Sequence, residues 1–77
     1  MVNNTRDKSL LIKFGSRLKE VRKLKNMSQN DLALEADIEK SQVYRIENGI
    51  TNPTFTSIIN LAKALNINPK ILFDPFD

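Results

Sequence analysis

Several residue types that build metal centres and covalent cross-links are missing from this chain. Its 77 residues contain no cysteine and no histidine. There is therefore no disulfide framework, and the usual zinc ligands are absent. Gly15 and Gly49 are the only glycines, so the chain also lacks a glycine-rich phosphate-binding loop. These absences predict a protein with no metal site and no cofactor.

Long apolar segments are missing too. No run of about 18 apolar residues is present, and the polar opening MVNNTRDKS is no signal peptide. We therefore predict a cytoplasmic protein with no membrane partner. The length predicts one domain over residues 1–77 with a small core, because so short a chain buries only about 60–65% of its unfolded surface. Such a domain is too small to wall off a catalytic cleft, and we predict that it is not an enzyme.

Positive charge gathers in the first third of the chain. Residues 1–25 hold eight basic and two acidic residues, a net charge of +6, whereas the remainder holds four basic and seven acidic residues, a net charge of −3. This asymmetry fits an anionic partner that approaches from one side. A lysine-rich helix face exposed to solvent has the same composition, so the pattern alone does not identify the partner.

Apolar periodicity predicts helices in the first half. A polar N-terminal arm of about residues 1–7 precedes a first helix from Lys8 to Lys25, whose apolar residues recur at three- and four-residue steps. Ser28 then caps a second helix, with Asp31 as the acid of a capping box. A corner at Asp37 and Ile38 leads to a third helix over residues 40–48.

The second half predicts two more helices. Thr54 caps a fourth helix whose inward residues begin with Phe55, and Asn66 stops it. A last short helix has Pro69 in its first position, and residues 74–77 are predicted to be irregular. No segment shows the pattern of a strand. The predicted fold class is all-α, a compact five-helix domain.

The segment SQNDLALEADIEKSQVYRIENG, followed by NPTFTSIINLAKAL, resembles the Xre/Cro-type helix-turn-helix domain of phage repressors and many small bacterial regulators. The likeness covers about Phe14 to Phe73. It implies a phage-repressor-like fold with a helix-turn-helix motif at 29–48, whose helix 40–48 enters the major groove of double-stranded DNA. The residues that carry the likeness are Ser28-Gln29, Leu32-Ala33, Ile38, Val43, Glu47, Gly49 and Pro53.

Two positions depart from the family pattern. Asp37 stands at the corner where glycine is usual, and it adopts a left-handed conformation only at some cost. Glu39 stands where Ser, Thr or Asp usually caps the third helix, and its longer side chain reaches back less well. Both departures predict a less stable turn, while the DNA-facing surface is kept.

The predicted third helix has an apolar side, with Val43 and Ile46, and a polar side. Arg45 on the polar side suits a bidentate contact to guanine, and its neighbours suit base edges or phosphates. Gln42 lies off this side and is a weaker candidate. The alternative is an ordinary solvated helix face. The candidate DNA-reading residues, which share one face at steps of one, three and four, are Lys40, Ser41, Tyr44 and Arg45.

Four further residues are candidates for phosphate contacts. The resemblance implies that Gln29 meets a phosphate where the second helix begins. Asn48, Thr51 and Asn52 flank or form the loop after the third helix, where short polar side chains and backbone N–H groups suit a phosphate cradle. The alternatives are a glutamine chosen for helix propensity and ordinary loop chemistry.

The resemblance also implies that Arg22 pairs with Glu47. Arg22 borders the apolar face of the first helix, and Glu47 follows the inward Ile46. Such a pair would lock the third helix against the first.

These features predict a sequence-specific DNA-binding transcriptional regulator. One module reads few base pairs, so we expect a homodimer on a palindromic operator whose half-sites lie about 34 Å apart. No small-molecule ligand is inferred. An alternative is a protein-interaction adaptor or antitoxin-like partner with the same fold. The candidate dimer surface, which alternatively packs within the domain, comprises Ile67, Ile71, Phe73 and Phe76.

Overall fold

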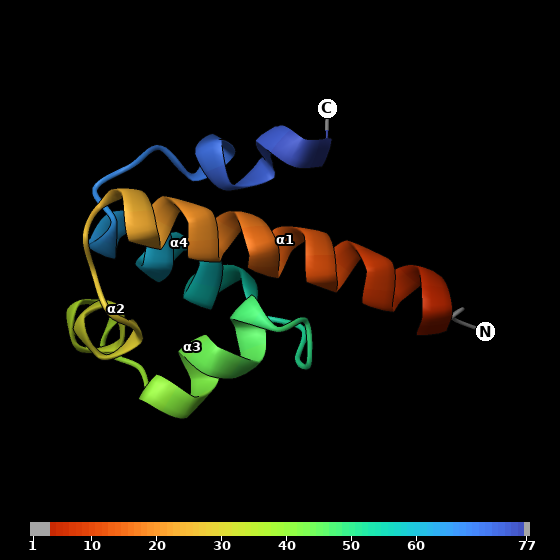
Figure 1. Cartoon of the computed structure of the whole chain (residues 1–77), viewed down its shortest axis with the longest axis horizontal. Coiled ribbons are helices and arrows are strands. Elements are labelled where there is room, and N and C mark those ends of the chain that lie inside the picture. The colour runs from red at the N-terminus through yellow and green to blue at the C-terminus, as the bar shows by residue number, and fades with distance from the viewer. Residues whose placement is uncertain (1–3, 77) are drawn as a thin grey trace.

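The computed structural model describes residues 4–76, which form four α-helices and a C-terminal 3₁₀ helix (Figure 1). No strand occurs within this range. The predicted all-α, five-helix fold is confirmed. The elements are α1 (Asn4–Leu24), α2 (Gln29–Ala36), α3 (Lys40–Glu47), α4 (Phe55–Ala64) and η1 (Pro69–Phe76).

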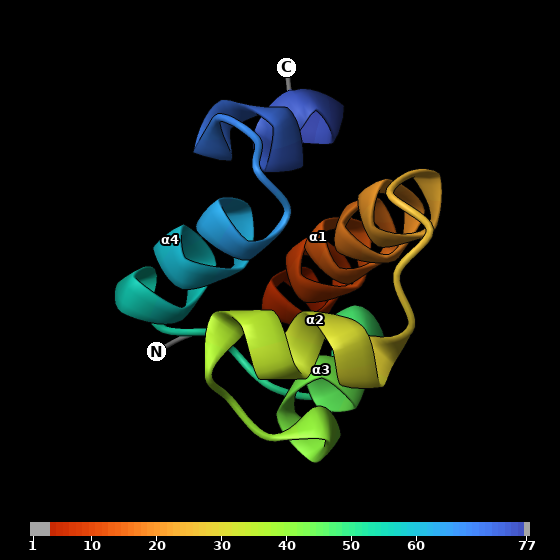
Figure 2. The ribbon, with the colours of Figure 1, turned by 90° about the vertical axis from the view of Figure 1, so that its left-hand side faces the viewer.

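One apolar cluster holds these elements together. α1 packs against α3 and η1, while α2 packs against α3 and α4. Figure 2 shows α2 and α3 on one side of the molecule and η1 on the other. Each buried aliphatic side chain contributes about 1.5–3 kcal/mol, which is how helices of only eight residues become stable. The buried core comprises Phe14, Leu18, Val21, Leu32, Ala33, Ala36, Val43, Ile46, Leu61, Ala62, Leu65 and Leu72.

Gly15 lets α1 and α3 approach closely. A Cβ atom on Gly15 would lie 2.6 Å from the carbonyl oxygen of Glu47, which is closer than Cβ atoms are found. The end of α3 therefore rests directly on the backbone of α1. A lone glycine inside an amphipathic helical pattern is the sequence signal for such a contact.

The predicted capping box at the start of α2 is confirmed. The Ser28 hydroxyl accepts a hydrogen bond from the Asp31 backbone N–H at 2.9 Å, and the Asp31 carboxylate accepts one from the Ser28 backbone N–H at 2.9 Å. The bond from the Ser28 backbone and, to a lesser extent, the Ser28 side chain lower the pKa of Asp31.

Two predicted boundaries were wrong. α1 begins at Asn4 rather than Lys8, so residues 4–7 of the predicted arm are helical, because the segment has no glycine or proline to stop the helix. Residues 1–3 of that arm lie outside the described residues. Residues 74–76, predicted to be irregular, belong to η1.

The predicted burial of Phe55 in α4 was wrong, and the apolar residues in and before η1 differ in their exposure. Phe55 was expected to face inward but is 76% exposed, because the first turn of α4 projects beyond the core and Ile58 is the first residue of this helix to pack against it. Ile67 and Ile71 are half-buried against the core, so they are largely used within the domain. Phe73 and Phe76 remain exposed.

Candidate nucleic-acid interface

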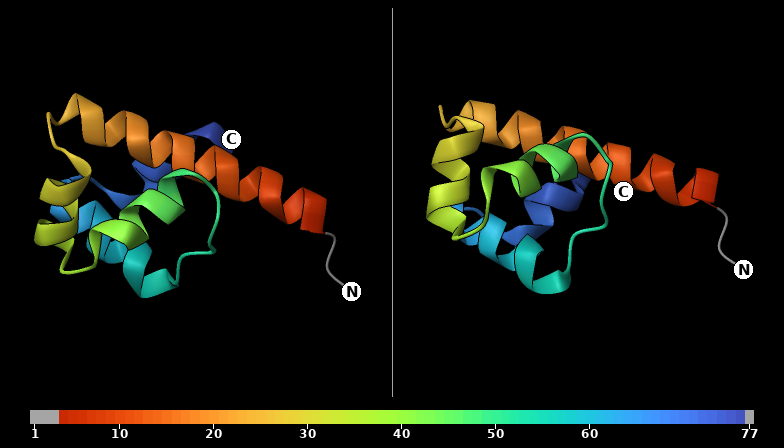
Figure 3. Two further views of the ribbon diagram at one scale, coloured as in Figure 1. Left: turned by 60° about the horizontal axis from the view of Figure 1, so that its bottom comes forward. Right: turned by 90° about the horizontal axis from the view of Figure 1, so that it is seen from below.

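α3 lies on the outside of the molecule with one face against the core (Figure 3). Val43 and Ile46 are fully buried on that face. Gln42 is half-buried, in keeping with its place beside the outward face. We call the exposed outward residues the polar ridge of α3: Lys40, Ser41, Tyr44 and Arg45.

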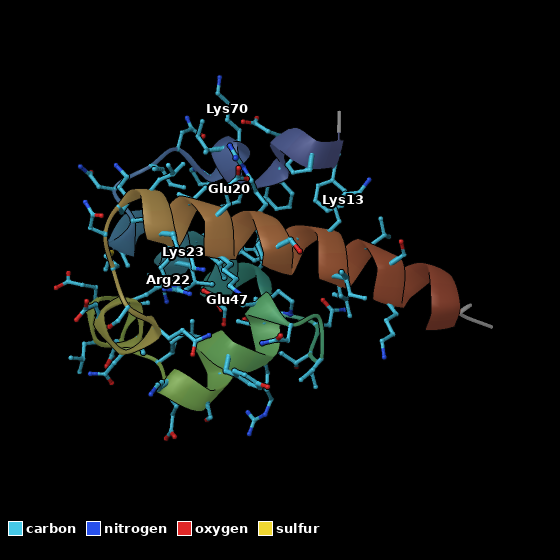
Figure 4. The ribbon with its side chains drawn as sticks, in the orientation of Figure 1. Lys13, Glu20, Arg22, Lys23, Glu47 and Lys70 are labelled. Atoms are coloured by element: carbon cyan, nitrogen blue, oxygen red, sulfur yellow. The ribbon has the colours of Figure 1, made fainter. Side chains whose placement is uncertain are left out.

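A buried ion pair holds α3 from behind. Arg22 donates to both carboxylate oxygens of Glu47, from Nε to Oε2 at 2.6 Å and from Nη2 to Oε1 at 3.0 Å. Its Nη1 donates to the Met27 carbonyl oxygen at 2.7 Å. Figure 4 shows Arg22 and Glu47 meeting between α1 and α3. This bidentate geometry fixes the end of α3, and Arg22 balances a negative charge that would otherwise oppose DNA.

Gln29 is joined to the same network. Its side-chain Nε2 donates to Glu47 Oε1 at 3.0 Å, which ties the start of α2 to the end of α3. A carboxamide has two N–H groups, so one remains for an acceptor such as a phosphate. The predicted phosphate contact of Gln29 thus stays a prediction, and the residue has a structural role that its position in the sequence did not reveal.

The corner between α2 and α3 is closed by the backbone. Asp37 adopts the left-handed conformation, with φ 57° and ψ 46°, as its place at a glycine position predicted. The Ile38 N–H donates to the Ala33 carbonyl oxygen at 3.0 Å. Glu39 makes no side-chain hydrogen bond to the start of α3, so the predicted weak cap is confirmed.

The loop after α3 begins with a tight turn. Asn48 caps the helix, because its side-chain Nδ2 donates to the Tyr44 carbonyl oxygen at 2.8 Å. Gly49 has a φ of 68° and lies against Ile12 of α1, where a Cβ atom would come within 2.6 Å of the Ile12 side chain. Thr51 is half-buried and Asn52 is exposed. These residues lie next to the polar ridge in the chain, and their contacts with phosphates remain predictions.

Two basic side chains of α1, Arg17 and Lys13, are directed toward η1. Arg17 donates from Nε to the Ile71 carbonyl oxygen at 2.9 Å and pairs with Asp74 at 3.1 Å. The Lys13 ammonium lies 5.4 Å from the centroid of the Phe76 ring. Figure 4 shows Lys13 on the side of α1 that faces η1. Part of the excess positive charge of residues 1–25 therefore lies on the η1 side of α1, away from α3.

Among the described side chains, no group of three or more His, Cys, Asp or Glu residues is placed to hold a metal ion. No helix within residues 4–76 combines the length and the apolar character that a membrane span needs.

The fold and the exposed α3 define a helix-turn-helix protein. The chain belongs to the helix-turn-helix family, whose model matches residues 18–72. It is a DNA-binding transcriptional regulator, as the sequence predicted.

Its relatives include control proteins. Control protein C.BamHI of Bacillus amyloliquefaciens is 37% identical over 75 residues, which span 96% of this chain and 86% of that protein. The crystal structure of the restriction-modification controller protein C.AhdI from Aeromonas hydrophila has a TM-score of 0.83 and 42% identity, and covers 84% of this chain and 98% of that one. The C.Esp1396I tetramer in complex with its natural 35-base-pair operator has a TM-score of 0.78 and 29% identity over 86% of this chain and 87% of that one.

Proposed function

We propose that this protein is the transcriptional controller of a restriction-modification system, and that it binds operator DNA as a homodimer with α3 in the major groove. The main support is the arrangement of α3, whose apolar face is fully buried while its polar ridge is exposed. A helix anchored from behind can enter a groove about 12 Å wide without exposing apolar residues. The control proteins among the relatives support the biological context.

Within this proposal the polar ridge of α3 reads the bases. Arg45 presents a planar guanidinium that matches the two acceptors of guanine, a contact worth about 1–3 kcal/mol of discrimination. Lys40 and Ser41 contact base edges or phosphates, and Tyr44 packs on a thymine methyl or donates to a phosphate. Gln42, beside the ridge, makes a lesser contribution.

The same proposal assigns phosphate contacts to the residues around α3. Gln29 uses its second amide N–H, while Asn48, Thr51 and Asn52 hold the backbone beyond the other end of α3. Such contacts set the position of the protein on the duplex and carry no sequence information. The homodimer places two copies of α3 about 34 Å apart on a palindromic operator in the cytoplasm. The proposal includes no catalysis and no small-molecule ligand.

Selection of bound duplexes from a random pool tests the sequence specificity. The expected product is a palindrome whose half-sites lie about one helical turn apart. Binding should also weaken about 10³- to 10⁵-fold between 50 and 200 mM salt if about 6–10 phosphates are neutralised. A pool that yields no shared sequence, or binding that salt does not weaken, would contradict the proposal.

A pair of single-charge variants tests the role of α3. Arg45→Ala is expected to lower affinity for the selected duplex about 5- to 150-fold, which corresponds to about 1–3 kcal/mol. Lys70→Ala is the control, because Lys70 is exposed on η1, on the far side of the molecule from α3 (Figure 4). It removes the same charge without touching the ridge. Fluorescence anisotropy titrations measure both affinities, and equal losses would contradict the assignment of α3 as the reading helix.

A further inference from the structure

Asn48 and Gly49, where α3 ends, form a pair whose chemistry favours deamidation. Of the asparagines in the chain, Asn48 alone precedes a glycine. In this reaction the backbone nitrogen of the next residue attacks the asparagine side chain, and a glycine has no Cβ atom to hinder the approach. Asn48 is exposed and is one of the proposed phosphate-contacting residues. A change in its side chain would therefore alter the proposed DNA-binding surface.

The reaction needs only these two residues and water. The Gly49 nitrogen forms a bond to Cγ of Asn48, and the bond from Cγ to Nδ2 breaks. Nδ2 leaves as ammonia and takes the proton of the Gly49 N–H. Water then opens the resulting succinimide ring at either carbonyl carbon, which gives aspartate or isoaspartate.

The folded turn holds both reacting groups in other contacts. The Gly49 N–H donates to the Ile46 carbonyl oxygen at 3.1 Å, so the attacking nitrogen is engaged. The Asn48 Nδ2, which must leave, donates to the Tyr44 carbonyl oxygen at 2.8 Å. Gly49 is also buried, with Ile12 of α1 beside it. The end of α3 must therefore open before the ring can close.

Either product would disturb the end of α3. A carboxylate has no hydrogen to donate to the Tyr44 carbonyl oxygen, and a negative charge is unfavourable at the C-terminal end of a helix. Isoaspartate also adds a carbon to the main chain beside Gly49, where even a Cβ atom would lie 2.6 Å from the Ile12 side chain. Both products would bring a negative charge toward the phosphates of the duplex.

We propose that Asn48 is a deamidation site through which the protein slowly loses operator binding. The hydrogen bonds at the end of α3 suppress the reaction while this end is closed, and local opening permits it. The product, with aspartate or isoaspartate at position 48, binds the operator less well. The loss of binding rests on the proposed function, whereas the reaction depends on the chain alone.

The conversion rates of the folded and unfolded protein test the reaction. Wild-type protein is incubated at one pH and temperature with and without guanidinium chloride, and the aspartate and isoaspartate forms are measured by mass spectrometry of peptides. Asn26 and Asn66, which precede other residues, are the controls within the same samples. In the unfolded chain Asn48 should convert first. In the folded protein its conversion should be about 5- to 150-fold slower, as expected if two hydrogen bonds must break.

Matched Asn→Asp variants test the effect on binding. Asn48→Asp reproduces one product, whereas Asn66→Asp makes the same change at an exposed position between α4 and η1, away from α3 (Figure 2). Circular dichroism melting verifies that each variant is folded. Fluorescence anisotropy with the selected duplex should show a loss of about tenfold or more for Asn48→Asp and little change for Asn66→Asp.

Aged wild-type protein keeps the test decisive if Asn48→Asp does not fold. A sample in which part of Asn48 has been converted is passed over the immobilised duplex. The unbound fraction should be enriched in the modified form. Equal proportions of this form in the bound and unbound fractions would overturn the proposed effect on binding.

The outcomes separate this inference from the proposed function. Equal conversion rates of Asn48 in the folded and unfolded protein, or earlier conversion of Asn26 or Asn66 in the unfolded chain, overturn the deamidation site. Operator binding by the unmodified protein would leave the proposed function standing. Suppressed conversion in a protein that binds no duplex would support the deamidation site and contradict the proposed function.

Discussion

Two arginines of α1 hold its neighbours in different ways. Arg22 binds α3 through Glu47, and the two side chains are only 8% and 1% exposed. Arg17 binds η1 through Asp74 and also pairs with Glu20, but its own side chain is 19% exposed and its partners are 51% and 63% exposed. The pair with α3 excludes water and the pairs on the η1 side do not. The ion pair that holds α3 is therefore better shielded from solvent than the pairs on the η1 side of α1.

The largest expected effect is the loss of the buried pair. Glu47→Ala leaves the Arg22 guanidinium buried without its carboxylate and removes the acceptor of Gln29, so the free energy of unfolding should fall by about 3–5 kcal/mol. Operator binding would be lost as a consequence of unfolding. Urea denaturation followed by circular dichroism measures the change. A Glu47→Ala variant as stable as the wild type would show that the buried pair contributes no more to stability than the exposed pairs of Arg17.

A second test concerns the close backbone contact on the same side. Gly15→Ala introduces a methyl group 2.6 Å from the Glu47 carbonyl oxygen, so α3 must shift away from α1. We expect a loss of about 1–3 kcal/mol despite the better helix propensity of alanine. Ser16→Ala, at an exposed neighbouring position, is the control and should not lower the unfolding free energy. Equal stability of the two variants would show that α3 can move without cost.

A third test concerns an exposed interaction within the helix-turn-helix motif, in contrast to the buried pair of Arg22 and Glu47. The Ser28–Asp31 capping box belongs to the motif but is exposed. The pKa of Asp31 is lowered in the folded protein below its ordinary value of 3.8. The ionised carboxylate therefore stabilises the fold fully above that ordinary value, and this contribution is lost as the pH falls through the lower pKa of the folded state.

Comparison of Asp31→Asn with the wild type checks that dependence. The wild type should melt at the higher temperature near neutral pH, and the difference should shrink as the pH falls below about 4. A difference that stays constant into strong acid would show that the carboxylate charge contributes nothing to the box.

The smallest effect is expected on the η1 side. Asp74→Ala removes the same charge as Glu47→Ala but breaks only an exposed pair, so the loss should be about 0.2–1 kcal/mol. The Arg17 hydrogen bond to the Ile71 carbonyl oxygen would remain and keep η1 in place. The same urea titrations compare the two variants. If Asp74→Ala costs as much as Glu47→Ala, exposure does not decide the strength of these pairs.

Local signals were sufficient to predict much of the motif from the sequence. The capping box depends on residues three apart, and the apolar spacing of α3 predicted that Val43 and Ile46 are buried. The conformation of the corner was also predicted locally: Asp37 stands where glycine is usual in the family, and it adopts the left-handed conformation. Short-range chemistry of this kind can be recognised without knowing how the helices pack.

Among the features that depend on packing, the Arg22–Glu47 pair was predicted from the family resemblance and is confirmed, but others were not predicted. The bond from Gln29 to Glu47 joins residues 18 apart and requires the angle between α2 and α3. The contact between Arg17 and Asp74 spans 57 residues. Phe55 follows the apolar spacing of α4 yet is exposed, because spacing alone does not show where the core ends. The DNA contacts on α3 were predicted from the family resemblance and remain to be tested.

The burial of Arg22 and Glu47 has a consequence for how added electrolyte acts on the protein. Mobile ions screen the interactions of charges that face solvent, including the attraction between cationic side chains and a nucleic acid. They screen a buried pair such as Arg22 and Glu47 much less. Concentrated salt should thus release the protein from its duplex while the frame behind the recognition helix stays rigid. Dilution would then restore binding at once, with no refolding step.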